Sequence, residues 1–158
     1  MLVQLLTHTP EPEHVAAAAA RLCYSDASIS QLLERAPDQA PKLLRKILDM
    51  GHLSVLEHVS FTFGIEGISR ACSHQLVRHR IASYSQQSQR YVSLEAPFEA
   101  VVPESIATRP ELAARFDQFL AATHELYRGL LEAGIPAEDA RFVLPNAAAT
   151  KLVMTMNA

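Results

Sequence analysis

Residues 78–90 of the chain read Arg-His-Arg-Ile-Ala-Ser-Tyr-Ser-Gln-Gln-Ser-Gln-Arg. The stretch has few aliphatic residues and many guanidinium, hydroxyl and amide groups, so we expect residues 80–91 to form a loop. Each arginine offers a planar fork that can hold a phosphate or a carboxylate through two parallel hydrogen bonds. This composition favours a binding surface for an oxygenated, anionic ligand, such as a phosphate joined to a base with amide-like edges.

The charge around this stretch is one-sided. Between Gly67 and Leu94 the sequence contains no Asp or Glu, whereas it contains four arginines and two histidines: Arg70, His74, Arg78, His79, Arg80 and Arg90. A local positive field of this kind attracts anions. A solvated basic face is the alternative interpretation, and the apolar and hydroxyl residues between the arginines make it less favoured.

The composition is that of a globular protein. The chain has 158 residues, of which 49% are hydrophobic and 20% charged, and this predicts a single domain over 1–158. The net charge of −3 argues against bulk binding of nucleic acid, and no apolar run approaches the roughly 20 residues of a membrane span. Cys23 and Cys72 are too few for a disulfide framework, so we expect both to be small buried packing residues in a reducing cytoplasm.

Apolar periodicity predicts an α+β fold in which helices outweigh strands. Strands are expected over 2–6 and over 58–65, where apolar and small polar residues alternate until Gly67 ends the strand. Residues 146–158 are mostly apolar and have a helical pattern. Further helices are expected over residues 14–23, 42–50, 68–79 and 110–134. A last helix is expected to begin at Pro136.

A helix over 68–79 would align the polar side chains of its sequence in two rows. One row would hold Gln75, Arg78 and His79, and the other Arg70, His74 and Arg78. A second polar cluster lies at 51–58, which read Gly-His-Leu-Ser-Val-Leu-Glu-His and join a helix to the next strand. Functional residues are often held at such connections by a rigid scaffold, and a helix-ending glycine followed by a turn is the structural alternative.

These motifs together resemble one known family. The spacing Arg-His-Arg-x-x-Ser-x-x-x-x-Ser-x-Arg resembles the signature of flavin-dependent thymidylate synthases, and six fixed positions meet it here: Arg78, His79, Arg80, Ser83, Ser88 and Arg90. The segment at 51–58 and the segment Asp-Ala-Arg-Phe-Val-Leu-Pro at 139–145 are also similar to that family. The resemblance extends over nearly the whole chain and implies a central antiparallel-type sheet flanked by long helices.

The resemblance implies an activity and its cofactors. Members of the family convert dUMP to dTMP with FAD, NADPH and methylenetetrahydrofolate, and they assemble as homotetramers with active sites at subunit interfaces. Reduced flavin supplies the hydride and the folate supplies the one-carbon unit. No enzymic cysteine attacks the uracil, so both cysteines of this chain would be dispensable for the chemistry.

The same resemblance implies the residues of the site. The residues that would contact FAD are Ser54, Glu57, Arg78, His79, Arg80, Ile81, Gln86 and Asn157. Those that would hold dUMP are Gln75, Leu76, Val77, Arg78, Gln86, Gln87, Ser88, Gln89, Arg90 and Arg141. The catalytic candidates are His52, as a neighbour of flavin or folate, with Ser88 and Arg90. We expect Ser88 to orient the nucleotide, because no motif position supplies a base that would make it a nucleophile.

The sequence departs from the family pattern at two places. Gln86 stands where relatives often have a carboxylate, so a hydrogen bond there would be neutral. Relatives also continue beyond Asn157 and Ala158 with arginine-containing segments, one of which is thought to activate the uracil. We therefore expect this chain to lack the C-terminal part of the family's sequence, and a protein that ended at Ala158 to have little turnover.

Two other functions remain open at this point. A metal-dependent hydrolase could use five potential ligands, namely His52, Glu57, His58, His74 and His79. Their spacing fits no standard zinc motif. An RNA-binding module could use the arginines, although only Tyr84 and Tyr91 lie nearby as stacking platforms.

Overall fold

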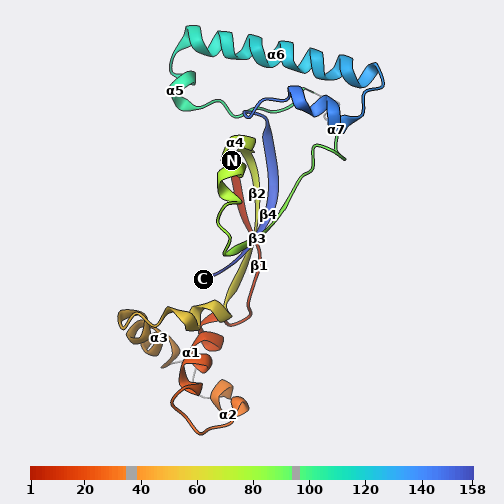
Figure 1. Ribbon diagram of the computed structural model, residues 1–158. Helices are drawn as coiled ribbons and strands as arrows, with labels where there is room; N and C mark the ends of the chain where they lie inside the picture. Colours follow the sequence, from red (N-terminus) through yellow and green to blue (C-terminus); the bar gives the residue numbers. More distant parts are fainter. Residues whose placement is uncertain (35–38, 94–96) are drawn as a thin grey trace. The chain divides into compact units, whose positions relative to one another are not determined.

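The computed structural model describes residues 1–34, 39–93 and 97–158. In this part of the chain a four-stranded sheet has the strand order β1-β2-β4-β3 (Figure 1). The strands are β1 (Leu2–His8), β2 (Ser60–Ser69), β3 (Ala82–Gln86) and β4 (Ala149–Asn157). The α-helices are α1 (Pro12–Leu22), α2 (Ile29–Glu34), α3 (Ala40–Asp49), α4 (Arg70–Leu76), α5 (Glu104–Ala107), α6 (Pro110–Glu132) and α7 (Ala137–Ala140). The 3-10 helices are η2 (Leu53–His58) and η3 (Arg141–Val143).

The sheet is antiparallel, which its hydrogen bonds show. The amide of Thr9, just after β1, donates to the carbonyl of Ser60 at the start of β2 across 3.0 Å. The amide of Arg70, just after β2, donates to the carbonyl of Ala148 before β4 across 2.9 Å. The amide of Gln87, just after β3, donates to the carbonyl of Lys151 near the start of β4 across 3.0 Å. The expected class, α+β with an antiparallel sheet, is confirmed.

The chain divides into two compact units. The first comprises residues 1–3, 64–80 and 84–153, and the second comprises residues 4–63, 81–83 and 154–158. Each of the four strands has residues in both units.

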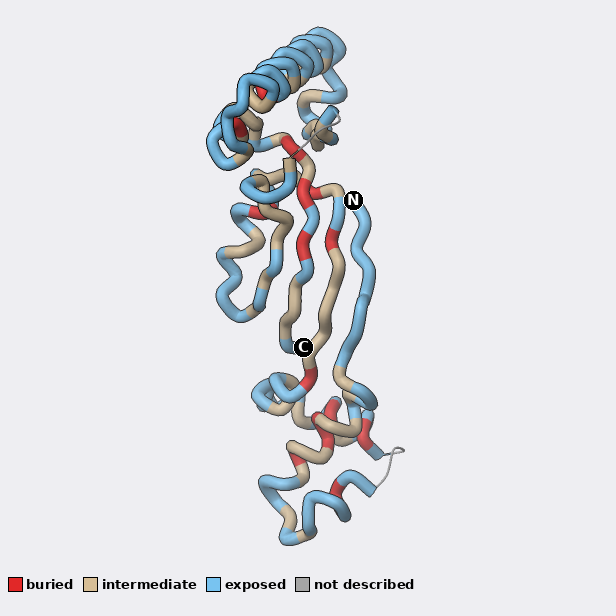
Figure 2. Tube along the Cα trace, turned by 90° about the vertical axis from the view of Figure 1, so that its right-hand side faces the viewer, coloured by how far each residue is buried: buried red, intermediate tan, exposed pale blue. Residues whose placement is uncertain are grey.

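The core of the second unit lies where α1 packs against α3 and η2. The buried residues are small on α1, where Ala16 and Ala17 let the facing helix approach closely, and larger opposite, at Leu44 and Val59. Figure 2 shows these buried stretches among the helices that follow β1. Gly51 ends the α3 region with a φ of 76°, as expected for a helix stop.

The first unit is organised around α6, the 23-residue helix predicted over 110–134. It contacts α5, α7 and η3, and it buries Tyr127 and Thr123, whose hydroxyl donates to the carbonyl of Phe119 across 2.8 Å. Most of α6 is exposed in Figure 2. Ala140 of α7 and Ala148 before β4 are fully buried.

The prediction of a helix over 68–79 is wrong at both of its ends. Strand β2 does not end at Gly67, because its pairing with the β4 side of the sheet continues to Arg70. Gly67 stays within the strand with a φ of 70°. Helix α4 therefore begins only at Arg70, capped by the hydroxyl of Ser69, which accepts from the amide of Cys72 across 3.1 Å. It ends at Leu76, three residues earlier than expected.

Two further expectations about secondary structure are corrected. Residues 146–158 are not helical, because residues 149–157 form β4 between β2 and β3. Alternate positions along it are buried, at Ala148, Thr150 and Leu152, which is the period of a strand and not of a helix. Residues 80–91 are not wholly a loop, because residues 82–86 form β3.

Both cysteines are exposed, which contradicts the expectation that they are buried packing residues. Cys72 lies on α4, where Ser73 takes the buried position instead. Cys23 follows the last residue of α1, and its thiol contacts the carbonyl of Ala19 at 3.7 Å. The apolar patterns around them therefore did not identify the inward-facing positions.

Candidate functional site

The segment that follows β3 is a turn built around Ser88. The hydroxyl of Ser88 accepts a hydrogen bond from the amide of Arg90 across 3.1 Å, and its carbonyl accepts from the amide of Val92 across 3.1 Å. At the start of the turn, Gln87 is fixed to β4 through Lys151. Four of the residues predicted to hold the nucleotide, Gln87 to Arg90, thus share one ordered turn.

A buried polar network anchors the end of β3. The amide nitrogen of Gln86 donates to the hydroxyl of Ser73 on α4 across 2.8 Å and to the hydroxyl of Thr150 on β4 across 3.1 Å. Ser73 in turn donates to the carbonyl of Arg70 across 3.0 Å. The network therefore joins α4, β3 and β4 beneath the turn. Ser73 and Thr150 were not among the predicted site residues.

Arginines from three segments surround the same turn. Arg70 donates to the carbonyl of Gln87 across 3.4 Å, while Arg90 forms an ion pair of 3.4 Å with Glu138 on α7. The Arg141 side chain donates to the carbonyl of Glu138 across 3.0 Å. Burial lowers the pKa of the Arg70 guanidinium, and the positive charge of Arg141 lowers it further. The first unit therefore brings the predicted residues Arg90 and Arg141 together with Arg70, which the prediction of site residues omitted.

The residues of the Arg-His-Arg motif lie in tight turns after α4 and not on its surface. The amides of Arg78 and His79 donate to the carbonyls of Gln75 and Leu76 across 3.1 Å each. The two aligned rows expected on a longer helix are therefore not formed. The hydroxyl of Tyr84 on β3 donates to the carbonyl of His79 across 3.2 Å.

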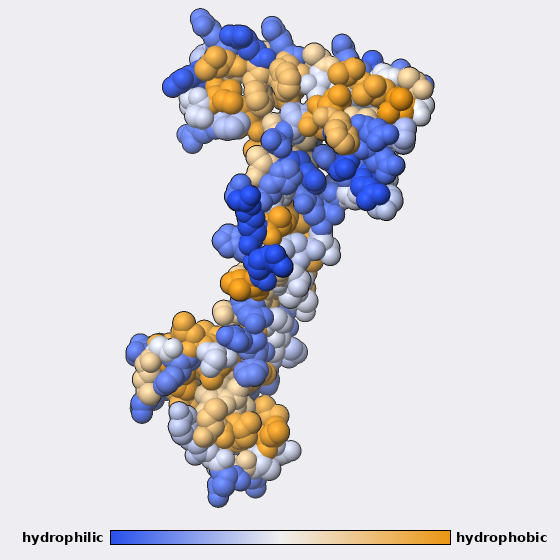
Figure 3. Space-filling view, viewed as in Figure 1, coloured by the Kyte–Doolittle hydropathy of each residue, from blue (hydrophilic) through white to orange (hydrophobic). Residues whose placement is uncertain are grey.

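The side chains around this motif are open to solvent. Arg78, His79 and Arg80 are exposed, as is Gln75, while Leu76 and Val77 are partly buried. Figure 3 shows hydrophilic residues gathered along the segment between α4 and β3 and along the segment after β3.

The remaining predicted residues belong to the second unit. Ser54 and Glu57 lie exposed on η2, directly after His52, whose amide donates to the carbonyl of Ile47 across 3.1 Å. Ile81 is 82% exposed although it is aliphatic, and Asn157 is the exposed last residue of β4.

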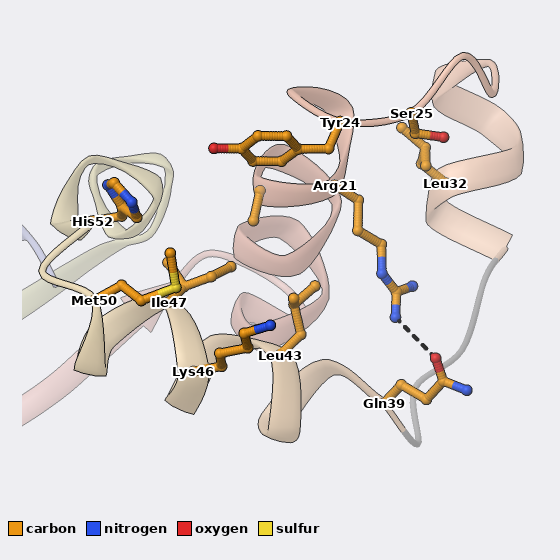
Figure 4. Close-up of a pocket in the computed structure, with 11 residues that line it drawn as sticks. Arg21, Tyr24, Ser25, Leu32, Gln39, Leu43, Lys46, Ile47, Met50 and His52 are labelled. Atoms are coloured by element: carbon orange, nitrogen blue, oxygen red, sulfur yellow. Dashed lines mark hydrogen bonds between the residues drawn. The ribbon is translucent and has the colours of Figure 1, made fainter.

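A pocket of about 740 Å³ lies between α1, α2 and α3 of the second unit (Figure 4). His52 and Lys46 line it, and the side chain of Arg21 donates to the amide oxygen of Gln39 across 3.3 Å. Its volume is in the range of small-molecule sites. The other lining residues are mostly apolar: Ala20, Tyr24, Ser25, Leu32, Leu43, Ile47 and Met50.

The described residues contain neither a metal cluster nor a membrane-spanning helix. No three His, Cys, Asp or Glu side chains of residues 1–34, 39–93 and 97–158 gather as ligands of one ion. Within the same residues, no helix has both the length and the apolar character to cross a membrane.

Comparison with known proteins places these features in a family. The family model described as "Thymidylate synthase complementing protein" matches residues 4–158. A flavin-dependent thymidylate synthase from Geobacter sulfurreducens is 56% identical over 160 residues, which cover all of this chain and 69% of that protein. One from Nitratidesulfovibrio vulgaris is 49% identical over 169 residues, covering 98% of this chain and 69% of that protein.

A solved structure supports the fold. The UMP/dUMP methylase PolB from Streptomyces cacaoi, bound with 5-Br dUMP, superposes with a TM-score of 0.79 at 24% identity. The match covers 99% of this chain and 72% of that one. With the sequence matches over almost its entire length, the chain belongs to the flavin-dependent thymidylate synthase family.

Proposed function

We propose that this chain takes part in the reductive methylation of dUMP to dTMP, with FAD as cofactor and with methylenetetrahydrofolate and NADPH as co-substrates. The single observation that carries the proposal is the turn from Gln87 to Arg90, which lies beside Arg70 and Arg141 and bears the family's signature residues. When bound, reduced FAD supplies a hydride, the folate supplies the carbon, and NADPH returns the flavin to its reduced form.

The charge arrangement suits a nucleotide phosphate. Arg90 and Arg141 both contact Glu138, at 3.4 Å and 3.0 Å. Burial lowers the pKa of Arg70, and the positive charge of Arg141 lowers it further. An anion held between such groups relieves their repulsion and gains charge-assisted hydrogen bonds. We assign the phosphate of dUMP to Arg70, Arg90 and Arg141, and its orientation to the turn fixed by Ser88.

The residues of the Arg-His-Arg motif suit the flavin cofactor. Arg78, His79 and Arg80 present exposed donors in successive turns, and guanidinium groups can hold a pyrophosphate through paired hydrogen bonds. We assign FAD to these three residues of the first unit. That Ser54, Glu57, Ile81 and Asn157 also contact FAD stays a prediction from the resemblance.

The pocket of the second unit suits the folate. It combines an apolar lining with the ammonium group of Lys46, and His52 is the residue expected beside the flavin or the folate. A folate tail has an aromatic ring and carboxylates, which match an apolar pocket with a cation at its rim. We therefore assign the tail of methylenetetrahydrofolate to this pocket. A homotetramer with shared active sites, located in the cytoplasm, stays a prediction.

A titration tests the flavin and nucleotide parts of the proposal together. The full-length protein is titrated with FAD, with and without dUMP, while the visible flavin spectrum is recorded. Saturable binding that perturbs the flavin band, with a further change when dUMP is added, is the expected result. A flavin spectrum that stays that of free FAD at saturating protein would overturn the proposal.

A further inference from the structure

The side chain of Gln86 is hydrogen-bonded to the hydroxyl groups of two residues that are almost completely buried. Its amide nitrogen donates to Ser73, which is 0% exposed, and to Thr150, which is 6% exposed. Both N–H bonds of the amide are thereby used inside the protein. Buried hydroxyls with defined partners hold a side chain more firmly than surface contacts do.

The direction of this network determines which way the Gln86 amide faces. The carbonyl of Arg70 can only accept, so the single proton of the Ser73 hydroxyl is donated to it across 3.0 Å. Towards Gln86, Ser73 can then only accept. A flipped amide would place its oxygen 2.8 Å from an oxygen with no proton to share. Ser73 therefore selects the orientation in which the nitrogen of Gln86 faces inward.

The amide oxygen of Gln86 has no hydrogen-bond donor among the described residues of this chain. This oxygen is also not one of the buried polar atoms without a partner, so it is accessible at the surface of the described chain. Gln86 immediately precedes the turn from Gln87 to Arg90 to which the nucleotide is assigned. A neutral acceptor at this point can accept a hydrogen bond from a ligand N–H, and it has no charge to repel a phosphate.

We propose that the amide oxygen of Gln86 accepts the imide N–H of a bound ring, and that Ser73 and Thr150 are positioning residues that fix this polarity. The inference rests on the proposed function. An imide N–H between two carbonyls occurs in the uracil of dUMP and in the flavin ring of FAD. A cytosine ring has an unprotonated acceptor at the same position, so the arrangement selects uracil over cytosine nucleotides.

Thr150 offers a matched pair of variants to test the role of the hydroxyl. Thr150→Val keeps the shape of the side chain and removes the hydroxyl, whereas Thr150→Ser keeps the hydroxyl. Affinities of the full-length protein are measured for dUMP, N3-methyl-dUMP and dCMP, and separately for FAD and N3-methyl-FAD. Steric effects of the methyl group cancel when the preference for the unmethylated ligand is compared between variants.

The wild-type protein is expected to prefer the ligand with a free imide. One hydrogen bond corresponds to a preference of up to roughly tenfold. Thr150→Val and Ser73→Ala should reduce this preference several-fold, Gln86→Leu should abolish it, and Thr150→Ser should retain it. A loss confined to the nucleotides identifies uracil as the partner, and a loss confined to the flavins identifies FAD.

The outcome separates this inference from the proposed function. If the variants bind FAD and dUMP but keep the wild-type preference for the free imide, the inference is wrong and the proposed function stands. If the wild-type protein binds neither ligand, both are overturned. Because a positioning role predicts a change in preference, a uniform loss of affinity for all the ligands would count against it.

Discussion

The guanidinium of Arg70 donates a hydrogen bond of 3.4 Å to the carbonyl of Gln87, and this contact ties the first residue of α4 to the first residue after β3. The contact joins two parts of the acid-free window, the start of α4 and the turn that bears the signature serine. Arg70 therefore has two roles in our proposal, since it holds the turn and contributes charge to the phosphate site.

We expect Arg70→Gln to weaken dUMP binding by roughly tenfold or more, because a charge-assisted hydrogen bond and a support of the turn are both lost. Isothermal titration with dUMP measures the change. Arg128→Gln is the matched control, because Arg128 pairs only with Glu132 on the exposed side of α6 among the described residues. Equal affinities of the Arg70 variant and the wild type would show that Arg70 does not contribute to the site.

We predict that Glu138, which pairs with Arg90 at 3.4 Å, competes with an anionic ligand for this arginine. The ion pair is about half exposed on both sides, so it contributes only about 0–1 kcal/mol to stability. Glu138→Gln should leave the melting temperature nearly unchanged and strengthen dUMP binding several-fold at low salt, because Arg90 and Arg141 lose a neighbouring negative charge. The gain should shrink as salt is added.

The control for Glu138 is Glu132→Gln, which removes a second arginine–glutamate pair of the first unit, with Arg128 at 3.6 Å on α6. It should alter neither the affinity nor its dependence on salt. If Glu138→Gln weakens dUMP binding, Glu138 supports the arrangement of the arginines and does not compete with the ligand.

Two lysines of α3 allow the folate pocket to be tested. Lys46 lines the pocket, whereas Lys42 is exposed on the same helix and does not. We expect Lys46→Glu to raise the KM for methylenetetrahydrofolate by roughly tenfold, because a favourable charge interaction is replaced by a repulsive one. The KM for dUMP should not change. Steady-state kinetics with Lys42→Glu as control would refute the assignment if both lysines gave the same result.

The local part of the fold could be predicted from the sequence, and the non-local part could not. Apolar periodicity predicted β1, α1, α3 and α6, because each has a continuous pattern of its own. It failed for β4, where a run of alanines has high helix propensity but the chain is paired between two strands. It also failed at Gly67, because a glycine can continue a strand with a positive φ as well as end one.

The candidate site shows the same division. Gln87 to Arg90 were predicted to hold the nucleotide from a motif whose residues are close in sequence. The structure joins them in one turn, and their binding role stays a prediction. Thr150 was missed because it is 64 residues away from Gln86, and a threonine in an apolar stretch has no distinguishing pattern. Arg70 carried one signal, which was its place in the acid-free window. Its contact with Gln87 depends on where β2 ends, and that end was predicted four residues too early, at Ile65 instead of at Ser69, the residue that caps α4.

Gly67 provides a test of whether β2 continues through this residue to Ser69. Its φ of 70° is a backbone conformation that costs a residue with a side chain about 1–2 kcal/mol. A Cβ at this position would also lie 3.3 Å from the Cα of Met1. We therefore expect Gly67→Ala to lower the free energy of unfolding by about 1–2 kcal/mol.

Gly129→Ala on α6 is the control for Gly67→Ala. A Cβ at Gly129 meets nothing within 4 Å, so this variant should raise the free energy of unfolding by up to about 1 kcal/mol. Urea unfolding of both variants measures the two changes, and opposite signs are required. A Gly67→Ala protein as stable as the wild type would mean that β2 does not pass through a left-handed residue before α4, and the start of the helix at Arg70 would then need another explanation.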